Sequence, residues 1–287
     1  MEDAMKIVKR VGCILLASLF ALCIFLVTMI AFMLIADAIV DTTVRWTPSY
    51  AKIDLTETLA KESWSEEDYE TLYEQTGLSR TALDEMKDDP ARILTFQDAL
   101  FYDGELEHVA AAITTQHDRF ADNYSAPIVD LQDGDVLVTS SCHTYGWQNG
   151  HAAIVIDGST RTVLESVSLG TPSTRTYNGA NFFRHSPNFV VLRLKDADEA
   201  KRAQIAETAY DRLLNIDYSV TVGILSPKDQ GVTPQETHCS HLVWQAYWYY
   251  GYDIDADGGP VCTARDIVHS DLFEVVQVFG FDPQNIW

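Results

Sequence analysis

One uncharged segment constrains the architecture of this chain more than any other feature. No side chain between Val11 and Ala36 carries a charge, and a run of this length exceeds the roughly 20 residues that a helix needs to cross a bilayer. We therefore expect a transmembrane anchor over residues 11–36. A cleaved signal peptide is the alternative, because residues 36–38 resemble a small-residue cleavage site. Its apolar region would span only about 7–15 residues, so an uncleaved anchor is favoured.

The charges that flank this segment predict its orientation. Lys6, Lys9 and Arg10 precede the apolar run, whereas Asp37 follows it. Because basic residues collect on the cytoplasmic side of a membrane helix, residues 1–10 should form a cytoplasmic N-terminus. The prediction is a single-pass protein of the cell membrane whose remaining residues are extracytoplasmic.

The charge balance excludes one class of partner. The chain has 42 Asp and Glu residues against 20 Lys and Arg residues, a formal net charge of −22. Nucleic acids and anionic lipid head groups would both be repelled, so neither is expected as a main partner. We interpret the acidic balance as a solvated surface, and contact with the membrane is expected only through the N-terminal helix.

Residues 37–53 and 54–127 precede the part of the chain where candidate chemistry lies. Residues 37–53 have few apolar side chains and predict a short tether. Residues 54–127 predict an acidic, helical lead-in region, with candidate helices after Ser65 and from Ser79 to Met86. One or two further helices are expected over Leu100–Phe120, with apolar positions at Val109, Ile113 and Phe120. No titratable cluster in this region has the spacing of a metal or catalytic site.

Residues 128–287 predict an α+β domain. Short runs rich in Val, Ile and Leu alternate with turn residues, which is typical of strands. The expected strands are 135–139, 152–157, 162–166 and 189–194. Gly158 and Ser159 separate the second and third of these as a hairpin turn would. An amphipathic helix is expected over 198–214, and strands followed by helices favour a mostly antiparallel sheet packed on helices.

Cys239 is the first candidate for chemistry. It lies at the start of a predicted helix whose apolar residues follow helical spacing, and Thr237 is a reasonable N-cap. The unpaired N–H groups and the positive end of the helix dipole favour a thiolate there and could stabilise an oxyanion. His238 or His241 could add to this effect. A buried structural cysteine is the plainer interpretation of the residue taken alone.

His151 and Glu165 are the other two candidates. His151 opens the strand His-Ala-Ala-Ile-Val-Ile-Asp, and Glu165 ends the next strand of the predicted hairpin. Because side chains alternate along strands, Glu165 could lie beside His151 and fix the orientation of its imidazole. A cysteine, a histidine and an orienting polar group form the usual arrangement for activating a thiol nucleophile.

Four short motifs together resemble the circularly permuted NlpC/P60 proteins, which are papain-like cysteine hydrolases of the YiiX/YebB type. The motifs are Gly134-Asp135-Val136-Leu137, Gly150-His151-Ala152-Ala153-Ile154, Leu164-Glu165-Ser166 and His238-Cys239-Ser240-His241-Leu242-Val243-Trp244. They occur in the order of the permuted branch, where the histidine strand precedes the cysteine. The resemblance covers roughly residues 128–280, and Ala264 stands where family proteins often have proline.

The resemblance implies a permuted papain-like fold and specific roles for three residues. Cys239 would be the nucleophile, His151 the general base and Glu165 the third member of the triad. The implied activity is cleavage of amide bonds, most plausibly in the peptides of bacterial peptidoglycan, with no metal or organic cofactor. A hydrolase or acyltransferase acting on lipids or other acyl substrates is one alternative. An inactive wall-binding or scaffold protein on the same fold is another.

Two further features leave alternatives open. Residues 253–258 match the first half of a calcium loop, but the twelfth position, where a bidentate Glu is expected, is Ala264. A simple turn is therefore the preferred interpretation, and no metal site is predicted. Cys142 and Cys262 could pair outside the cell and leave Cys239 free, although two free thiols fit the sequence equally well.

Overall fold

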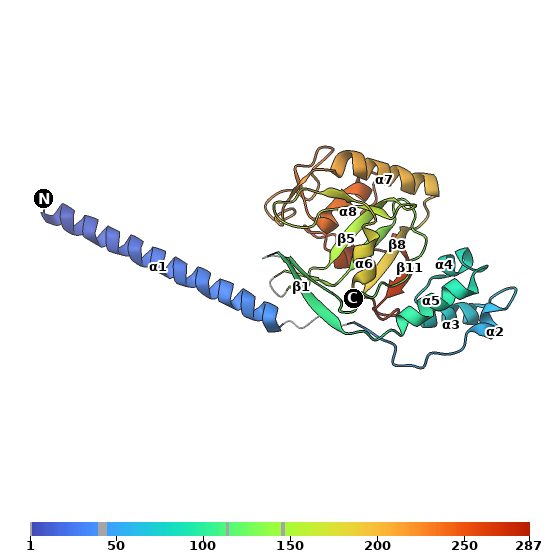
Figure 1. Ribbon diagram of the computed structural model, residues 1–287. Coiled ribbons are helices and arrows are strands. Elements are labelled where there is room, and N and C mark those ends of the chain that lie inside the picture. Colours follow the sequence, from blue (N-terminus) through green and yellow to red (C-terminus); the bar gives the residue numbers. More distant parts are fainter. Residues whose placement is uncertain (1, 40–44, 113–114, 145–146) are drawn as a thin grey trace. The chain divides into compact units, whose positions relative to one another are not determined.

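A computed structural model describes residues 2–39, 45–112, 115–144 and 147–287 (Figure 1). The chain divides into two compact units. The first comprises Met1–Asp41 with Thr144–Trp147, and the second comprises Thr42–His143 with Gln148–Trp287. The architecture is mixed α+β with antiparallel sheets.

The helices and strands have the following bounds. The helices are α1 (Glu2–Ile39), α2 (Thr56–Leu59), α3 (Glu66–Thr76), α4 (Arg80–Glu85), α5 (Pro90–Leu100), α6 (Ala180–His185), α7 (Glu199–Leu213), α8 (Cys239–Trp248) and α9 (Ala264–Val268). The strands are β1 (Leu106–Ala112), β2 (Thr115–Phe120), β3 (Val136–Thr139), β4 (Cys142–His143), β5 (His151–Asp157), β6 (Thr162–Glu165), β7 (Thr174–Thr176), β8 (Phe189–Leu194), β9 (Asp217–Tyr218), β10 (Glu236–Thr237) and β11 (Phe273–Phe279).

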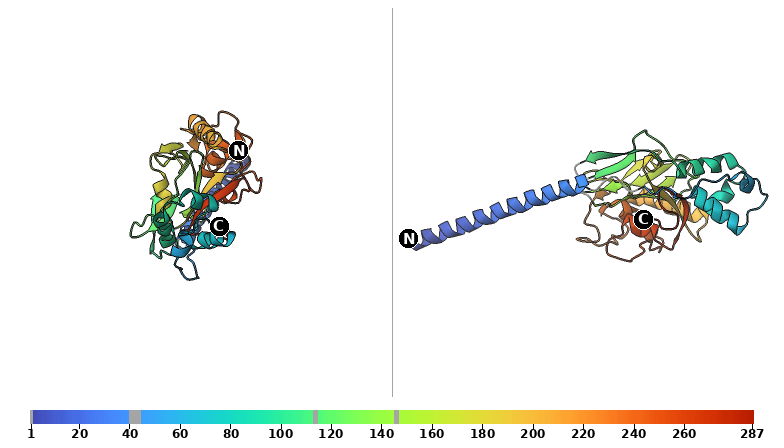
Figure 2. Two further views of the ribbon diagram at one scale, coloured as in Figure 1. Left: turned by 90° about the vertical axis from the view of Figure 1, so that its right-hand side faces the viewer. Right: turned by 90° about the horizontal axis from the view of Figure 1, so that it is seen from below.

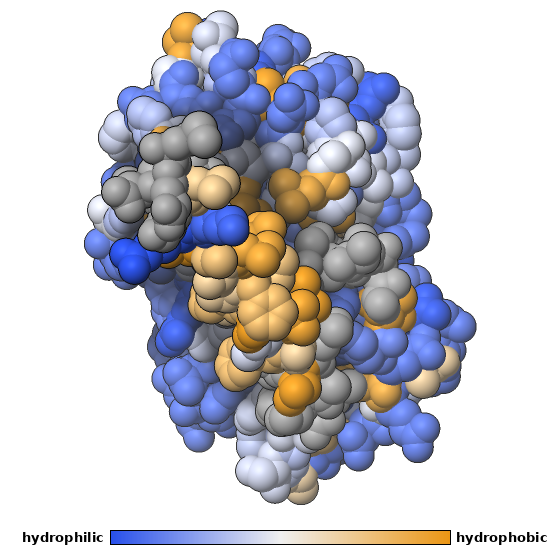
Figure 3. Space-filling model, turned by 90° about the vertical axis from the view of Figure 1, so that its left-hand side faces the viewer, coloured by the Kyte–Doolittle hydropathy of each residue, from blue (hydrophilic) through white to orange (hydrophobic). Residues whose placement is uncertain are grey.

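The helix α1 is long and apolar enough to cross a membrane. Its most apolar part, Lys9–Met33, spans 25 residues at a mean hydropathy of 2.8 and buries none of its surface within the protein. Figure 3 shows hydrophobic residues gathered in one region of a surface that is otherwise mostly hydrophilic, and α1 supplies most of the exposed large apolar side chains. A helix that exposes apolar side chains all round needs an apolar surrounding, which fits the predicted anchor.

A six-stranded antiparallel sheet organises the second unit, in the order β11-β8-β3-β5-β6-β7. One face of the sheet packs against α7, α8 and α9. The other face packs against α2–α6 and the segment that contains Ile128 and Leu131. The sheet is therefore buried on both faces, which explains why every residue of β3 and β8 is buried and why nearly all of them are apolar. In Figure 2 the helices α2–α5 gather together at one end of this unit.

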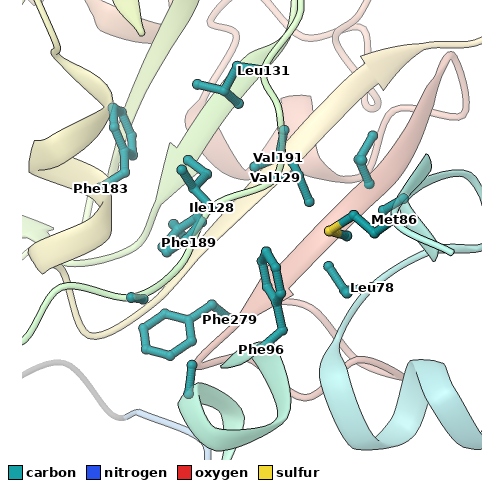
Figure 4. Packing of buried hydrophobic residues seen from close by; sticks show 14 of the residues in the cluster. Leu78, Met86, Phe96, Ile128, Val129, Leu131, Phe183, Phe189, Val191 and Phe279 are labelled. Carbon is teal, nitrogen blue, oxygen red and sulfur yellow. The ribbon is translucent and has the colours of Figure 1, made fainter. Parts of the chain in front are cut away.

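The helical lead-in shares a core with the sheet. Figure 4 shows side chains from the C-terminal end of α4, from α5 and from the sheet pointing toward one another, among them Met86, Phe96, Val191 and Phe279. Leu78 is fully buried and forms an isolated backbone bridge with Gln277 of β11. Residues 54–100 are thus continuous with the fold that positions the candidate site.

The prediction of helices over Leu100–Phe120 was wrong beyond the end of α5. β1 and β2 form an antiparallel hairpin here, and β4 pairs with β2 to complete a second sheet. Val109 lies directly opposite His117, and Phe120 is fully buried. The antiparallel pairing of these two strands, which the sequence does not show, outweighed the helical spacing of the apolar residues. Ile113 lies outside the described residues.

The predicted tether is also shorter than residues 37–53. The helix α1 continues to Ile39, and the chain is attached to the second unit again by residue 46, where the Trp46 N–H donates to the Gly280 carbonyl at 2.9 Å. The Arg45 guanidinium packs over the rings of Phe120 and Phe279. Residues 45–53 therefore belong to the folded unit, because their polar groups find partners on it.

Candidate active site

The hairpin β5–β6 presents His151 and Glu165 to the same face of the sheet. Ile154 pairs with Leu164 in this hairpin, so His151 and Glu165 are diagonal neighbours across the two strands. The Nε2 atom of His151 lies 2.7 Å from Oε2 of Glu165, and both side chains are almost completely buried. The structure thus contains the cross-strand pair that strand alternation predicted.

A third residue holds the carboxylate in place. The hydroxyl of Thr176 on β7 donates a 2.6 Å hydrogen bond to Oε1 of Glu165. Each carboxylate oxygen therefore accepts one hydrogen bond, from Thr176 on one side and from His151 on the other. Although burial raises the pKa of Glu165, these hydrogen bonds and the positive imidazole outweigh it, and the net pKa is lowered. Glu165 is consequently ionised beside His151.

Two aromatic rings fix the plane of the imidazole. The ring of Phe183 stacks on His151 with centroids 5.7 Å apart, and the ring of Phe182 meets it edge-on at 5.6 Å. Both phenylalanines belong to α6, which was not predicted. Their short helix carries no strong sequence signal, since it spans only six residues. The packing leaves the imidazole little freedom to rotate away from Glu165.

The helix α8 presents Cys239 to the same imidazole. Cys239 is the first residue of α8, and it is 8% exposed. The Nε2 atom of His151 is occupied by Glu165, and the imidazole lies close enough to the thiol to lower the pKa of Cys239. Three residues that lie up to 88 positions apart in the sequence therefore meet in one buried cluster, in the order thiol, imidazole, carboxylate.

The pKa values of the Cys239 thiol and the His151 imidazole are shifted in opposite directions. Burial raises the pKa of Cys239, but hydrogen bonds and positive charge from His151 and His238 outweigh it and hold that pKa well below its usual value. Burial lowers the pKa of His151, but its hydrogen bonds to Cys239 and Glu165 outweigh that effect and raise the pKa to about 10. The stable form near neutral pH is therefore a thiolate beside an imidazolium.

The N-cap of α8 is His238, not Thr237 as predicted. His238 has an extended backbone, and its Nδ1 accepts the His241 N–H at 3.3 Å. Thr237 instead pairs in β10 with Tyr218 of β9, and its hydroxyl bonds to Nδ1 of His241. The shift by one residue places Cys239 at the very first helical position.

The start of α8 offers backbone donors beside the sulfur. The Nδ1 atom of His238 accepts a hydrogen bond from the His241 N–H, and the Leu242 N–H donates to the His238 carbonyl. The N–H groups of Cys239 and Ser240 have no backbone acceptor among the described residues. Two such donors next to a nucleophile can stabilise the oxyanion of a tetrahedral intermediate.

His241 has a structural position. Its Nδ1 bonds to the hydroxyl of Thr237, and its Nε2 lies 2.8 Å from the backbone carbonyl of Lys228. Burial lowers the pKa of His241 to about 4, so it is neutral at physiological pH. Of the two histidines proposed to assist Cys239, only His238 lowers the pKa of the thiol.

The acidic segment at residues 253–258 forms a turn braced by a lysine. The Lys228 ammonium bonds to the buried carboxylate of Asp255 and to the Gly259 carbonyl. The Trp244 indole N–H donates to Asp253 at 2.8 Å. Oxygens of Asp255, Asp257 and Asp266 come within 4.8 Å of one another, but the lysine already supplies a cation at the buried member of this group.

All five cysteines are free thiols. Cys142 lies next to the candidate site, because its carbonyl accepts the N–H of Gly150, which precedes His151. Burial raises the pKa of Cys142, with a further contribution from Cys239, and burial also raises the pKa of Cys262. Of Cys142, Cys239 and Cys262, only Cys239 has a lowered pKa, which makes it the candidate nucleophile.

Comparisons with known proteins give one similar structure. No protein-family model and no curated protein matches the sequence. Among solved structures, the metalloprotein YiiX of Escherichia coli O157:H7 is similar, with a TM-score of 0.40 and 15% sequence identity. The match covers 51% of this chain and 97% of the YiiX chain. At this level of similarity, conclusions about the candidate site depend on its own geometry.

Proposed function

We propose that this protein is a membrane-anchored, extracytoplasmic cysteine hydrolase on a circularly permuted papain-like fold of the NlpC/P60 type. Its substrate would be an amide bond in the peptides of a bacterial cell wall. The observation that carries the proposal is the buried cluster of Cys239, His151 and Glu165, in which the thiol has a lowered pKa and the imidazole a raised one. A lowered thiol pKa serves a nucleophile, whereas a cysteine that only packs in the core has no need of it.

The geometry supports an acyl-transfer mechanism. The Cys239 thiolate attacks the amide carbonyl carbon, and the N–H groups at the start of α8 hold the resulting oxyanion. The imidazolium of His151 gives its proton to the amine as the carbon–nitrogen bond breaks. His151 then removes a proton from water, which attacks the thioester and releases the acid and the thiolate. Glu165 holds the imidazole in orientation and stabilises its positive charge throughout.

Digestion of purified cell-wall peptides tests the proposal. We expect the full-length protein in detergent to release new amino termini from these peptides, as measured by labelling of the liberated amines. Cys239→Ala should abolish release, because no other group in the cluster can form the acyl intermediate. Cys262→Ser is the matched control, since this thiol is buried and has a raised pKa. Release that persists in Cys239→Ala would contradict the proposal.

A lipid or other acyl substrate is the second candidate, and one observation favours it. Val220, Ile224 and Leu225 are exposed on the segment that follows β9. β9 pairs with β10, which immediately precedes Cys239. Exposed apolar side chains on a segment connected to the start of α8 in this way suit an acyl chain. Release of fatty acid from membrane lipids, with wall peptides left intact, would favour this candidate over the first.

A further inference from the structure

A pocket next to the candidate active site is lined by hydrogen-bond donors. It has a volume of about 220 Å³ and is lined by His117, Arg119, Asn123, Phe182, His185 and Ser186. Three of these side chains are of basic type and none is acidic, although the chain as a whole has a formal net charge of −22. A lining that contains hydrogen-bond donors and an arginine but no carboxylate suits a negatively charged group.

A single aromatic ring connects this pocket to the catalytic histidine. Phe182 lines the pocket, and its ring contacts His117 at 5.2 Å and His151 at 5.6 Å between centroids. Because both imidazoles contact the same ring, their centroids lie at most about 11 Å apart, a distance that about three extended peptide residues can span. The pocket therefore lies within a few peptide residues of the catalytic imidazole.

Arg119 is the charged donor of the pocket. Its Nε bonds to Glu107 at 2.5 Å across the β1–β2 hairpin. Its two terminal nitrogens have no hydrogen-bond partner within the described part of the chain, and its side chain is 43% exposed. The planar end of a guanidinium matches the two oxygens of a carboxylate. Glu107 thus orients the arginine while leaving its terminal nitrogens open.

The neighbouring side chains add neutral donors. Burial lowers the pKa of His117, so its imidazole offers an N–H without a charge. Asn123 follows β2 at a positive φ of 58° and contributes an amide to the wall. The Nδ1 of His185 is taken by the Tyr124 carbonyl at 2.9 Å. Asp118, the nearest acidic residue along β2, alternates to the opposite face and bonds to His108 and His143.

We propose that this pocket binds a carboxylate of the substrate peptide, two or three residues away from the amide bond that Cys239 attacks. The inference rests on the proposed peptide hydrolase and specifies its substrate, namely an acidic peptide or a peptide with a free C-terminus close to the scissile bond. Arg119 is the specificity-determining residue. It comes from the β1–β2 hairpin, which lies outside the region of family resemblance.

Binding to an inactive variant tests the pocket without requiring turnover. The full-length Cys239→Ala protein in detergent is titrated with N-acetyl-trialanine and, separately, with its C-terminal amide, by isothermal titration calorimetry. We expect the free acid to bind at least tenfold more tightly than the amide, because a hydrogen bond to a charged group is lost in the amide. Equal affinities, or binding of neither peptide, would overturn the proposal. A third probe, N-acetyl-Ala-Glu-Ala amide, shows whether a side-chain carboxylate substitutes for a terminal one.

Two further substitutions, both made in Cys239→Ala, separate a binding role from a structural one. Arg119→Gln should remove the preference for the free acid. Glu107→Gln should strengthen binding of the free acid by roughly threefold or more, since Arg119 would no longer share its charge; a merely structural ion pair predicts no gain. Arg80→Gln is the matched control, because Arg80 also bonds to an exposed glutamate, Glu66, and does not line the pocket.

The outcomes keep the pocket and the hydrolase distinguishable. The pocket proposal would be overturned if the preference for the free acid over the amide survives in Arg119→Gln or disappears in Arg80→Gln. If the expected preference is found but the protein with Cys239 intact cleaves no wall peptide, the proposed function is contradicted. The proposal of a carboxylate-binding pocket is then still supported.

Discussion

At the scale of single residues, the triad predicts unequal effects of substitution. His151→Ala should reduce turnover nearly as much as Cys239→Ala, because the thiol loses its base and the leaving amine loses its acid. Glu165→Gln should cost only about tenfold to a thousandfold, since an amide can still orient the imidazole but stabilises its charge less. Steady-state rates on one peptide substrate measure the series. A Glu165→Gln enzyme as inactive as His151→Ala would contradict the assigned order.

Cys142 is the residue that could overturn this assignment. Its thiol is buried next to the cluster, and burial raises its pKa, so it should be unreactive. Cys142→Ser is therefore expected to keep most of the activity. If activity disappears in Cys142→Ser and survives in Cys239→Ala, the nucleophile is Cys142, and the resemblance to permuted NlpC/P60 proteins loses its basis.

The opposed pKa shifts of thiol and imidazole predict the pH dependence of the reactive pair. The pKa of Cys239 is lowered, so its thiolate is present at neutral pH and is lost only as the pH falls through that lowered value. The pKa of His151 is raised to about 10, so its proton is lost only as the pH rises through about 10. Alkylation by iodoacetamide should therefore already be fast at pH 7, and turnover should fall toward pH 10.

His151→Ala is the control for this profile. Without the imidazolium, the thiolate loses its main stabilising partner, and the midpoint of alkylation should move upward toward that of an ordinary buried thiol. A midpoint that stays unchanged in His151→Ala would show that the helix terminus alone lowers the pKa of Cys239.

At the scale of single elements, His238 links the stability of α8 to the reactivity of its first residue. His238→Ala removes the side chain that accepts the His241 N–H, so unfolding should become easier by about 1 kcal/mol, as for other N-cap losses. It also removes a group that lowers the pKa of Cys239. Thermal melting and alkylation rates should both change, whereas His241→Asn should affect mainly stability.

The turn at residues 253–258 provides a second test at this scale. Lys228 neutralises the buried carboxylate of Asp255, so Lys228→Met should destabilise the protein by about 3 kcal/mol, the usual cost of leaving a buried charge unpaired. EDTA should leave the melting temperature of the unsubstituted protein unchanged. A rise of several degrees with calcium would contradict the interpretation as a turn, because a ligand bound only by the native state stabilises it.

The elements also show which parts of the fold a sequence can reveal. β8 has the predicted bounds, and α7 begins one residue after its N-cap Asp198, because long apolar runs and capping residues are local signals. β7 and α6 were missed, although they supply Thr176 and Phe183 to the site. Each is only a few residues long, and its role depends on contacts with distant strands.

At the scale of the whole molecule, the candidate site was predictable because its members carry separate local signals. Cys239 opens a helix, and His151 and Glu165 belong to one hairpin, so each position could be chosen before the three were seen together. The carboxylate pocket could not be predicted in this way. It depends on the pairing of β1 with β2, where the spacing of Val109, Ile113 and Phe120 was interpreted as helical.

The orientation of the chain in the membrane is the last prediction. The uncharged segment of α1 and the basic residues before it predict that the second unit lies outside the cytoplasm. Protease added to intact spheroplasts should therefore degrade this unit, and a cytoplasmic marker protein should survive in the same sample as the control. Digestion that requires lysis would reverse the orientation. A mature protein that begins after residue 36 and is found free in the medium would replace the anchor with a cleaved signal peptide. In either case a wall-peptide hydrolase would need a different route to its substrate.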